Sequence, residues 1–241
     1  MKEIYLDNSA STQIDNNVLE YMFQIAKDCY ANPSSVHKLG QKSRRIMDES
    51  RETIAMFLKV KSRELIFTSS GSEANNLALR GVMKSQKYKG NHIISTKIEH
   101  SSVLKTLEDL EKEGVEVTLL DVDKYGNINL EDLTKAIKPS TRLISIIHAN
   151  NEIGTIQDIK SIGEICKAKN IVFHVDAVQS FGKILFYPEE YNINLMSIAA
   201  HKLYGPKGIG ALYNSSGTKL EKIITGGYQE RNRRAGTENI P

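Results

Sequence analysis

Short apolar runs alternate with helical segments from residue 65 onward, and this alternation constrains the fold more than any other feature. Apolar strands are predicted at 65–68, 93–96, 115–122, 142–147, 171–175, 195–200 and 208–213. Helices are predicted between most of them, and two more precede them, at about 15–30 and 41–58. Strands that are almost continuously apolar are buried on both faces. The pattern therefore predicts an α/β fold with three layers, in which helices cover both faces of a mainly parallel sheet.

Composition excludes several classes of protein. The 241 residues carry 32 basic and 29 acidic side chains, a near-even balance that does not favour nucleic-acid binding. Only two cysteines occur, which excludes a disulfide-built scaffold and suits a reducing compartment. No signal-peptide core or membrane-length apolar run is present, and the six histidines lack metal-ligand spacing. The expectation is a cytoplasmic protein that binds no nucleic acid, membrane or metal.

A lysine stands just after one apolar strand, where ligands bind in parallel sheets. The run 195–200 leads into His201 and Lys202, followed at once by a Gly/Pro turn. Burying an ammonium group costs several kcal/mol, but the same desolvation lowers the pKa of the lysine and frees its amine to form a Schiff base. The alternative is structural: the strand ends at the surface, and Lys202 opens a turn.

Polar groups follow four other strands, and each has a structural alternative. The segment 69–72 could seat an anion at a helix start, or Ser72 could simply cap that helix. His100 could stack on a ring or transfer protons, or merely begin a helix. The segment 150–152, Asn-Asn-Glu, could bind a ligand or shape a turn. Asp176 lies among apolar residues, where it needs a cationic partner such as a protonated ring nitrogen.

Together these groups match what pyridoxal 5′-phosphate requires of a protein. The cofactor is bound through a lysine, with an aspartate beside its pyridine nitrogen and a cradle for its phosphate. The aspartate keeps that nitrogen protonated, so that the ring can accept electrons. Pyridoxal 5′-phosphate is therefore the predicted cofactor. A nucleotide-binding α/β protein is disfavoured because no phosphate-loop fingerprint is present.

Five motifs resemble those of the cysteine desulfurases of the NifS-like branch, within the class V aminotransferase family of fold-type I pyridoxal-phosphate enzymes. They are Phe67-Thr68-Ser69, Glu99-His100, Asn150-Asn151-Glu152-Ile153-Gly154, His174-Val175-Asp176-Ala177 and His201-Lys202-Leu203-Tyr204-Gly205-Pro206-Lys207-Gly208. The similarity extends over nearly the whole chain. It implies an N-terminal arm at 1–14 and, at 15–241, the pyridoxal-phosphate-binding large domain of that fold.

The resemblance assigns roles to individual residues. It makes Lys202 the lysine that binds the cofactor covalently and His100 the ring-stacking residue, also proposed as an acid–base group. Asp176 matches the partner of the pyridine nitrogen, Gln179 that of the ring hydroxyl, and Asn151 a residue near the cofactor and the substrate carboxylate. The implied phosphate contacts are Gly71, Ser72, His201 and, across the interface of a homodimer, Thr237.

The family reaction converts L-cysteine to L-alanine and leaves a persulfide on an enzyme cysteine. That sulfur passes to iron–sulfur scaffold proteins or tRNA-thiolation enzymes, so these classes are the implied partners. This sequence departs from the family in three places. Ala199 replaces a serine that usually contacts the phosphate, and Tyr228 interrupts a usually glycine-rich stretch. The chain also ends at Pro241, where relatives continue into a small domain with the sulfur-accepting cysteine and a substrate-binding arginine.

These departures lead to an expectation about activity. Cys166 lies on the apolar face of a predicted helix, and Cys29 matches no catalytic position, so neither replaces the sulfur-accepting cysteine. The chain is expected to be a truncated form that binds the cofactor but does not turn over cysteine alone. Two alternatives stay open: a sister class V enzyme such as selenocysteine lyase, and a non-catalytic remnant that binds the cofactor or a partner.

Overall fold

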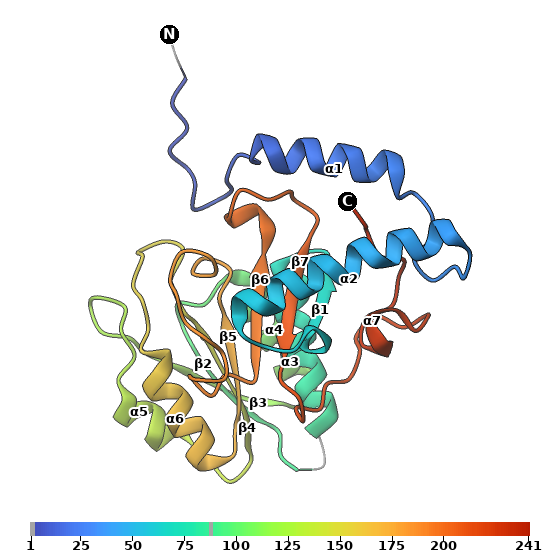
Figure 1. Ribbon diagram of the computed structural model, residues 1–241. Coiled ribbons are helices and arrows are strands. Elements are labelled where there is room, and N and C mark those ends of the chain that lie inside the picture. The colour runs from blue at the N-terminus through green and yellow to red at the C-terminus, as the bar shows by residue number, and fades with distance from the viewer. Residues whose placement is uncertain (1–2, 87–88) are drawn as a thin grey trace.

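A computed structural model describes residues 3–86 and 89–241, and within them one mixed sheet of seven strands forms the centre of the molecule (Figure 1). Its spatial order is β1-β7-β6-β5-β4-β2-β3. The strands are β1 (Leu65–Thr68), β2 (His92–Thr96), β3 (Glu116–Leu120), β4 (Thr141–Ile147), β5 (Val172–Asp176), β6 (Leu195–Ala199) and β7 (Gly210–Asn214).

Most neighbouring strands of this sheet are parallel. The pairs that join β3, β2, β4, β5 and β6 are all parallel, whereas β7 lies antiparallel between β6 and β1. The antiparallel pair follows from chain length, because only the short segment 200–209 connects β6 to β7. The predicted mainly parallel sheet is confirmed, with β7 as its one antiparallel member among the described strands.

Helices cover both faces of the sheet, as the almost continuously apolar strands require. On one face lie α2 (Lys38–Leu58), α5 (Leu130–Ala136) and α6 (Ile159–Lys169), which share a core with strand residues such as Met196. On the other lie α3 (Gly71–Gln86) and α4 (Ser101–Lys112), which share a second core with residues such as Leu195. Leu195 and Met196 are adjacent in β6 and point to opposite faces. The three-layer arrangement is confirmed.

Two segments lie outside these layers. The helix α1 (Asn16–Asp28) begins after Asp15, whose carboxylate accepts hydrogen bonds from the first-turn amides, as the sequence predicted. Figure 1 shows α1 above the sheet, and its end lies beside the N-terminal part of α2, where Ser43 donates to the Cys29 carbonyl. Near the C-terminus, the short α7 (Gln229–Asn232) is held by Glu230, which forms a buried, two-pronged ion pair with Arg51 of α2 at 2.7 Å. No helix in the described residues is long and apolar enough to cross a membrane.

Candidate functional site

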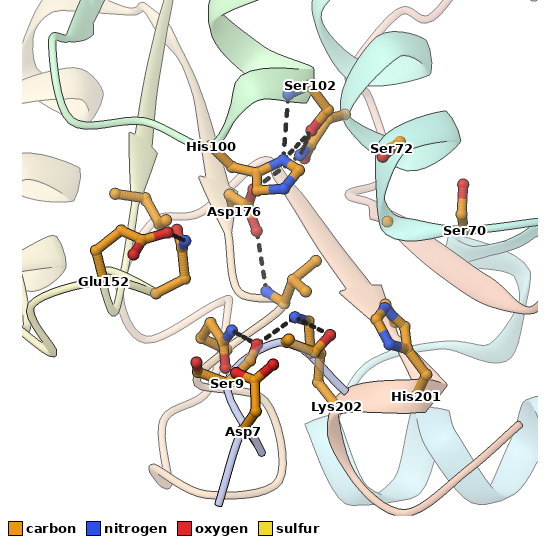
Figure 2. Close-up of a pocket in the computed structure, with 18 residues that line it drawn as sticks. Asp7, Ser9, Ser70, Ser72, His100, Ser102, Glu152, Asp176, His201 and Lys202 are labelled. Carbon is orange, nitrogen blue, oxygen red and sulfur yellow. Dashed lines mark hydrogen bonds between the residues drawn. The ribbon is translucent and has the colours of Figure 1, made fainter. Parts of the chain in front are cut away.

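A cavity of about 480 Å³ opens at the carboxyl ends of β4, β5 and β6 (Figure 2). The last residue of each of these strands, Ile147, Asp176 and Ala199, is among its lining residues. The structure brings most of the sequence-predicted site residues together around it: Gly71, Ser72, His100, Asn151, Asp176, Gln179, His201 and Lys202. Thr237 is exposed and does not line the cavity.

Asp176 ends β5 with its carboxylate buried at the base of the cavity. The residue is 2% exposed. Its Oδ2 accepts a hydrogen bond from Asn75 Nδ2 at 2.7 Å, and its Oδ1 accepts one from the backbone N–H of Val178 at 3.0 Å. Burial raises the pKa of Asp176, and these two hydrogen bonds, with the nearby charge of Lys202, oppose that rise. The group is thus a buried carboxylate with two donors and room for a cationic partner.

His100 is the N-cap of α4, so its ring is oriented by the start of the helix. Nδ1 accepts from the backbone N–H of Ser102 at 3.1 Å and lies 2.8 Å from the Ser102 hydroxyl. Because that backbone N–H can only donate, Nδ1 carries no proton, and the neutral ring has its proton on Nε2. Figure 2 shows the ring beside Asp176 at the upper end of the cavity. The prediction that His100 begins a helix is therefore confirmed. The same residue also lines the cavity.

Lys202 lies in a single 3-10 turn, η2 (Ala200–Lys202), directly after β6. Its Nζ donates hydrogen bonds to the backbone carbonyls of Ser9 and Ala10, in the N-terminal arm. Burial lowers the pKa of Lys202, and the positive charge of Lys183 adds to that effect, whereas Asp176 and Asp7 oppose it. A lowered pKa is what a nucleophilic amine requires.

The first turn of α3 forms one wall of the cavity. Ser70, rather than Ser72, caps the helix: its Oγ accepts from the backbone N–H of Glu73 at 3.1 Å. The alternative in which Ser72 is the cap is therefore wrong. Within the described chain, the amides of Gly71 and Ser72 donate to no protein acceptor, so they can bind an anion.

Gly71 allows the start of α3 to pack closely against Val178 and Ala199, which also line the cavity. A Cβ at that position would lie 2.6 Å from Cγ2 of Val178 and 3.4 Å from Cβ of Ala199. His201 also faces the cavity, and burial together with the charges of Lys202 and Lys207 lowers the pKa of its imidazole. Ala199 is 1% exposed and offers no hydroxyl to an anion. The wall therefore supplies helix amides and an imidazole as anion contacts.

The Asn-Asn-Glu segment shapes a turn and also lines the cavity. Asn150 shapes the turn, because its Oδ1 accepts from the backbone N–H groups of Glu152 and Ile153. Asn151 and Glu152 line the cavity, where their side chains are hydrogen-bonded to each other at 2.7 Å. Gln179 lines it as well and donates to the Ser9 carbonyl at 2.7 Å.

Several residues at the cavity were not predicted from the sequence. Asn75 and Ser102 line it and are hydrogen-bonded to each other at 2.9 Å, and Asp7 and Ser9 form its edge. A polar residue on the otherwise apolar inner face of α3 was the signal for Asn75, since such a residue needs a buried partner. No local pattern marks the N-terminal arm, which reaches the cavity only through the tertiary fold.

Both cysteines lie away from the cavity. Cys29 and Cys166 are buried, and burial raises the pKa of the Cys166 thiol to about 12, so this thiol is inert. Among residues 3–86 and 89–241, no group of three His, Cys, Asp or Glu side chains is placed to hold a metal ion.

Comparison with known proteins agrees with this architecture. Residues 4–241 match the model of the family described as aminotransferase class-V. The cysteine desulfurase IscS of Clostridium botulinum (strain Hall) is 48% identical over 238 residues, which cover 99% of this chain and 60% of that protein. The putative cysteine desulfurase IscS 1 of Bacillus subtilis is 46% identical over 241 residues, which cover 100% of this chain and 64% of that protein.

Solved structures give the same result. A NifS-like protein superposes with a TM-score of 0.97 at 40% identity, covering 99% of this chain and 66% of that one. The structure described as SspA in complex with cysteine has a TM-score of 0.96 at 40% identity, and the match covers 99% of this chain and 69% of that one. The chain spans about 60% of the length of the curated relatives it matches. It belongs to the class V aminotransferase family, and within that family it is similar to the IscS/NifS-like cysteine desulfurases.

Proposed function

We propose that this chain binds pyridoxal 5′-phosphate through Lys202 and is a desulfurase-type protein acting on L-cysteine. The observation that carries the proposal is the placement of Lys202 and Asp176 in one cavity (Figure 2), whose wall includes the helix amides of Gly71 and Ser72, which have no protein acceptor among the described residues. The residues fit the cofactor: the amides of Gly71 and Ser72 line the cavity, and within residues 3–86 and 89–241 Asp176 has no cationic partner at hydrogen-bond distance. When bound, the cofactor supplies an electron-accepting ring.

Each protein group has a task in this arrangement. The amine of Lys202 attaches the cofactor, and its lowered pKa increases the unprotonated fraction. Asp176 holds a proton on the pyridine nitrogen. The amides of Gly71 and Ser72, with His201, bind the phosphate. His100, which lines the cavity, would stack on the cofactor ring.

The substrate and partners are inferred from the relatives. Proteins described as cysteine desulfurases share 46–48% of residues with this chain, and the structure described as SspA was solved in complex with cysteine. We therefore propose L-cysteine as substrate, a homodimer in which Thr237 reaches the partner's phosphate site, and iron–sulfur or tRNA-thiolation proteins as sulfur acceptors. Both cysteines of this chain are buried, so turnover by the chain alone requires a thiol added from outside.

Trapping of the cofactor tests this proposal. The protein is incubated with pyridoxal 5′-phosphate, reduced with borohydride and digested, and the labelled peptide is identified by mass spectrometry. Labelling at Lys202 is expected, and Lys202→Ala removes it, whereas the exposed Lys207→Ala, five positions along the chain, does not. A label at another lysine, or none, would refute the proposal.

The reaction is tested separately with L-cysteine and L-selenocysteine in the presence of dithiothreitol. Alanine and sulfide formed from L-cysteine support desulfurase activity. Alanine formed from L-selenocysteine only would identify the chain as a selenocysteine lyase. A labelled but inactive protein would support a non-catalytic role in binding the cofactor.

A further inference from the structure

A chain of three hydrogen bonds joins Asp176 to His100 along the wall of the cavity. The Nδ2 group of Asn75 donates one hydrogen to Asp176 Oδ2 at 2.7 Å and the other to Ser102 Oγ at 2.9 Å. The Ser102 hydroxyl in turn lies 2.8 Å from His100 Nδ1. Asn75 thus stands between the Asp176 carboxylate and the Ser102 hydroxyl that contacts the His100 ring.

The direction of every bond in this chain can be assigned. Nδ1 of His100 accepts from a backbone N–H, so it also accepts from the Ser102 hydroxyl. The oxygen of Ser102 is then free to accept from Asn75. The amide of Asn75 turns its nitrogen toward Asp176, and its own Oδ1 is buried without a hydrogen-bond partner in the described protein. If the amide were flipped, Oδ1 of Asn75 would lie next to Oδ2 of Asp176, which is favourable only when Asp176 is protonated. The observed orientation therefore matches an ionised Asp176.

We infer that Asn75 is a positioning residue that keeps Asp176 ionised and ties it to the orientation of His100. Its two amide hydrogens are fully used, one on each side, and the residue itself is 1% exposed. A buried carboxylate with fewer donors is more readily protonated, and a protonated Asp176 cannot hold a proton on a ring nitrogen. The expected loss of the proton on the cofactor nitrogen rests on the proposed function. The expected change in the ionisation of Asp176 does not, because it concerns the protein alone.

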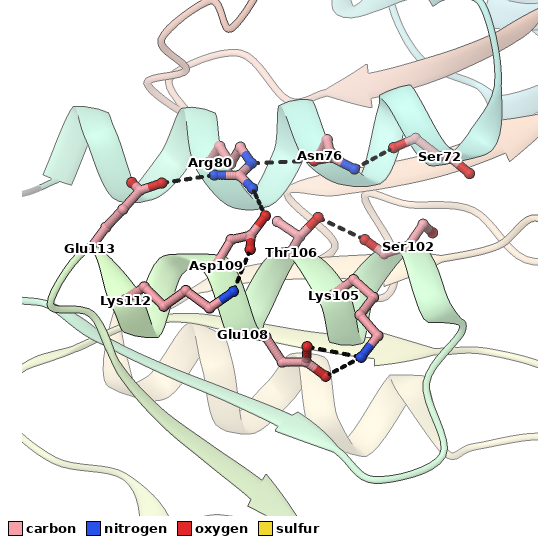
Figure 3. A network of polar contacts seen from close by, with 10 residues as sticks. All are labelled: Ser72, Asn76, Arg80, Ser102, Lys105, Thr106, Glu108, Asp109, Lys112 and Glu113. Atoms are coloured by element: carbon pink, nitrogen blue, oxygen red, sulfur yellow. Dashed lines mark hydrogen bonds and ion pairs between the residues drawn. The ribbon is translucent and has the colours of Figure 1, made fainter.

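The surroundings of Asn75 allow it to be replaced without moving the helices. Arg80 of α3 forms ion pairs with Asp109 and Glu113 of α4 at 2.8 and 3.0 Å (Figure 3). Buried apolar side chains of both helices pack in the same core. The next residue, Asn76, faces away from Asp176: it donates to the Ser72 carbonyl and accepts from Arg80. Asn76→Ala is therefore a matched control.

The test is an NMR titration of the protein without cofactor, with the ¹³Cγ signal of Asp176 assigned by its loss in Asp176→Asn. Among the described residues, the titratable groups that face Asp176 are Glu99, His100 and Lys202, and all three are present in each variant compared. Asn75→Ala is expected to raise the midpoint of the Asp176 titration by about one pH unit or more, since a charge-assisted hydrogen bond is lost. Asn76→Ala is expected to leave it unchanged. Equal midpoints in the two variants would overturn the inference.

Two further variants keep the test decisive. Ser102→Ala removes only the His100 side of the bridge, so the ¹⁵N shifts of the His100 ring should change while the Asp176 midpoint stays in place. If Asn75→Ala does not fold, Asn75→Asp retains the size of the side chain and sets a second carboxyl against Asp176, which should also raise the midpoint. An unchanged midpoint in Asn75→Asp would refute the inference. Because no cofactor is present, failure of Lys202 labelling would affect only the proposed function.

Discussion

The Glu99 carboxyl gives the sharpest prediction about stability. Glu99 is 5% exposed, its Oε1 accepts from the Thr96 hydroxyl at 2.7 Å, and its Oε2 has no hydrogen-bond partner in the described protein. Burial raises its pKa to about 8, and the neighbouring charge of Asp176 contributes to the rise. In the folded protein Glu99 is therefore protonated at neutral pH. Glu99→Gln replaces it with a neutral group of similar size.

The sign of the pH effect follows from proton binding. Between pH 4.5 and about 8 the folded protein holds a proton on Glu99 that the unfolded chain has released. This contribution to the free energy of unfolding is fully present below pH 4.5 and is lost as the pH rises through about 8. His148 and His174 act in the opposite sense, because burial lowers their pKa values to about 4 and about 3. Their contribution changes mainly around and below pH 6.5, the usual histidine value, and it is the same in wild type and Glu99→Gln, so it cancels when the two are compared.

Chemical denaturation of wild type and Glu99→Gln side by side between pH 6.5 and 8 therefore isolates the effect of the Glu99 carboxyl. At about 1.4 kcal/mol per pH unit, and with half the protons lost by pH 8, the free energy of unfolding of the wild type should fall by about 1.5 kcal/mol relative to that of Glu99→Gln. The control is Glu108→Gln on α4, because the Glu108 side chain is 50% exposed. Parallel stability profiles for wild type and Glu99→Gln would show that Glu99 is ionised when folded and would refute the reasoning.

Three further predictions concern packing and the anion wall. Glu230→Gln leaves Arg51 buried without its counter-charge, so the free energy of unfolding should fall by about 3–5 kcal/mol in urea titrations, whereas a double Met substitution at both positions should cost less. Equal losses would contradict the ion-pair argument. Ala199→Ser adds a hydroxyl to the anion wall and should tighten binding of pyridoxal 5′-phosphate about tenfold in equilibrium dialysis; unchanged affinity would show that Ala199 does not face the phosphate. In Gly163→Ala the new Cβ would lie 1.9 Å from the carbonyl oxygen of Tyr191, so thermal unfolding should shift downward by an amount equivalent to at least about 2 kcal/mol. An unchanged melting temperature would exclude that clash.

The order of strands and helices was predictable because it depends on local properties of the sequence. Apolar periodicity located all seven strands of the described sheet, and Asp15 marked the start of α1. The sequence also indicated that Asp176 and Lys202 would be neighbours, because parallel strands place their carboxyl ends at one edge. The antiparallel insertion of β7 was not predicted, since strand pairing depends on contacts between distant segments.

Within the site, residue types came from the sequence and their partners from the fold. Motif resemblance selected Lys202, but only the tertiary structure placed its amine against the carbonyl of Ser9, 193 positions away. Asn75 is linked to Asp176 across 101 positions, and no local signal encodes that distance. Apolar periodicity, helix caps and strand ends depend on residues that are close together in the sequence, so the sequence alone specified them. The charge state of Asp176 and the partners of the anion wall depend on burial and on donors from other elements, which only the packed structure decided.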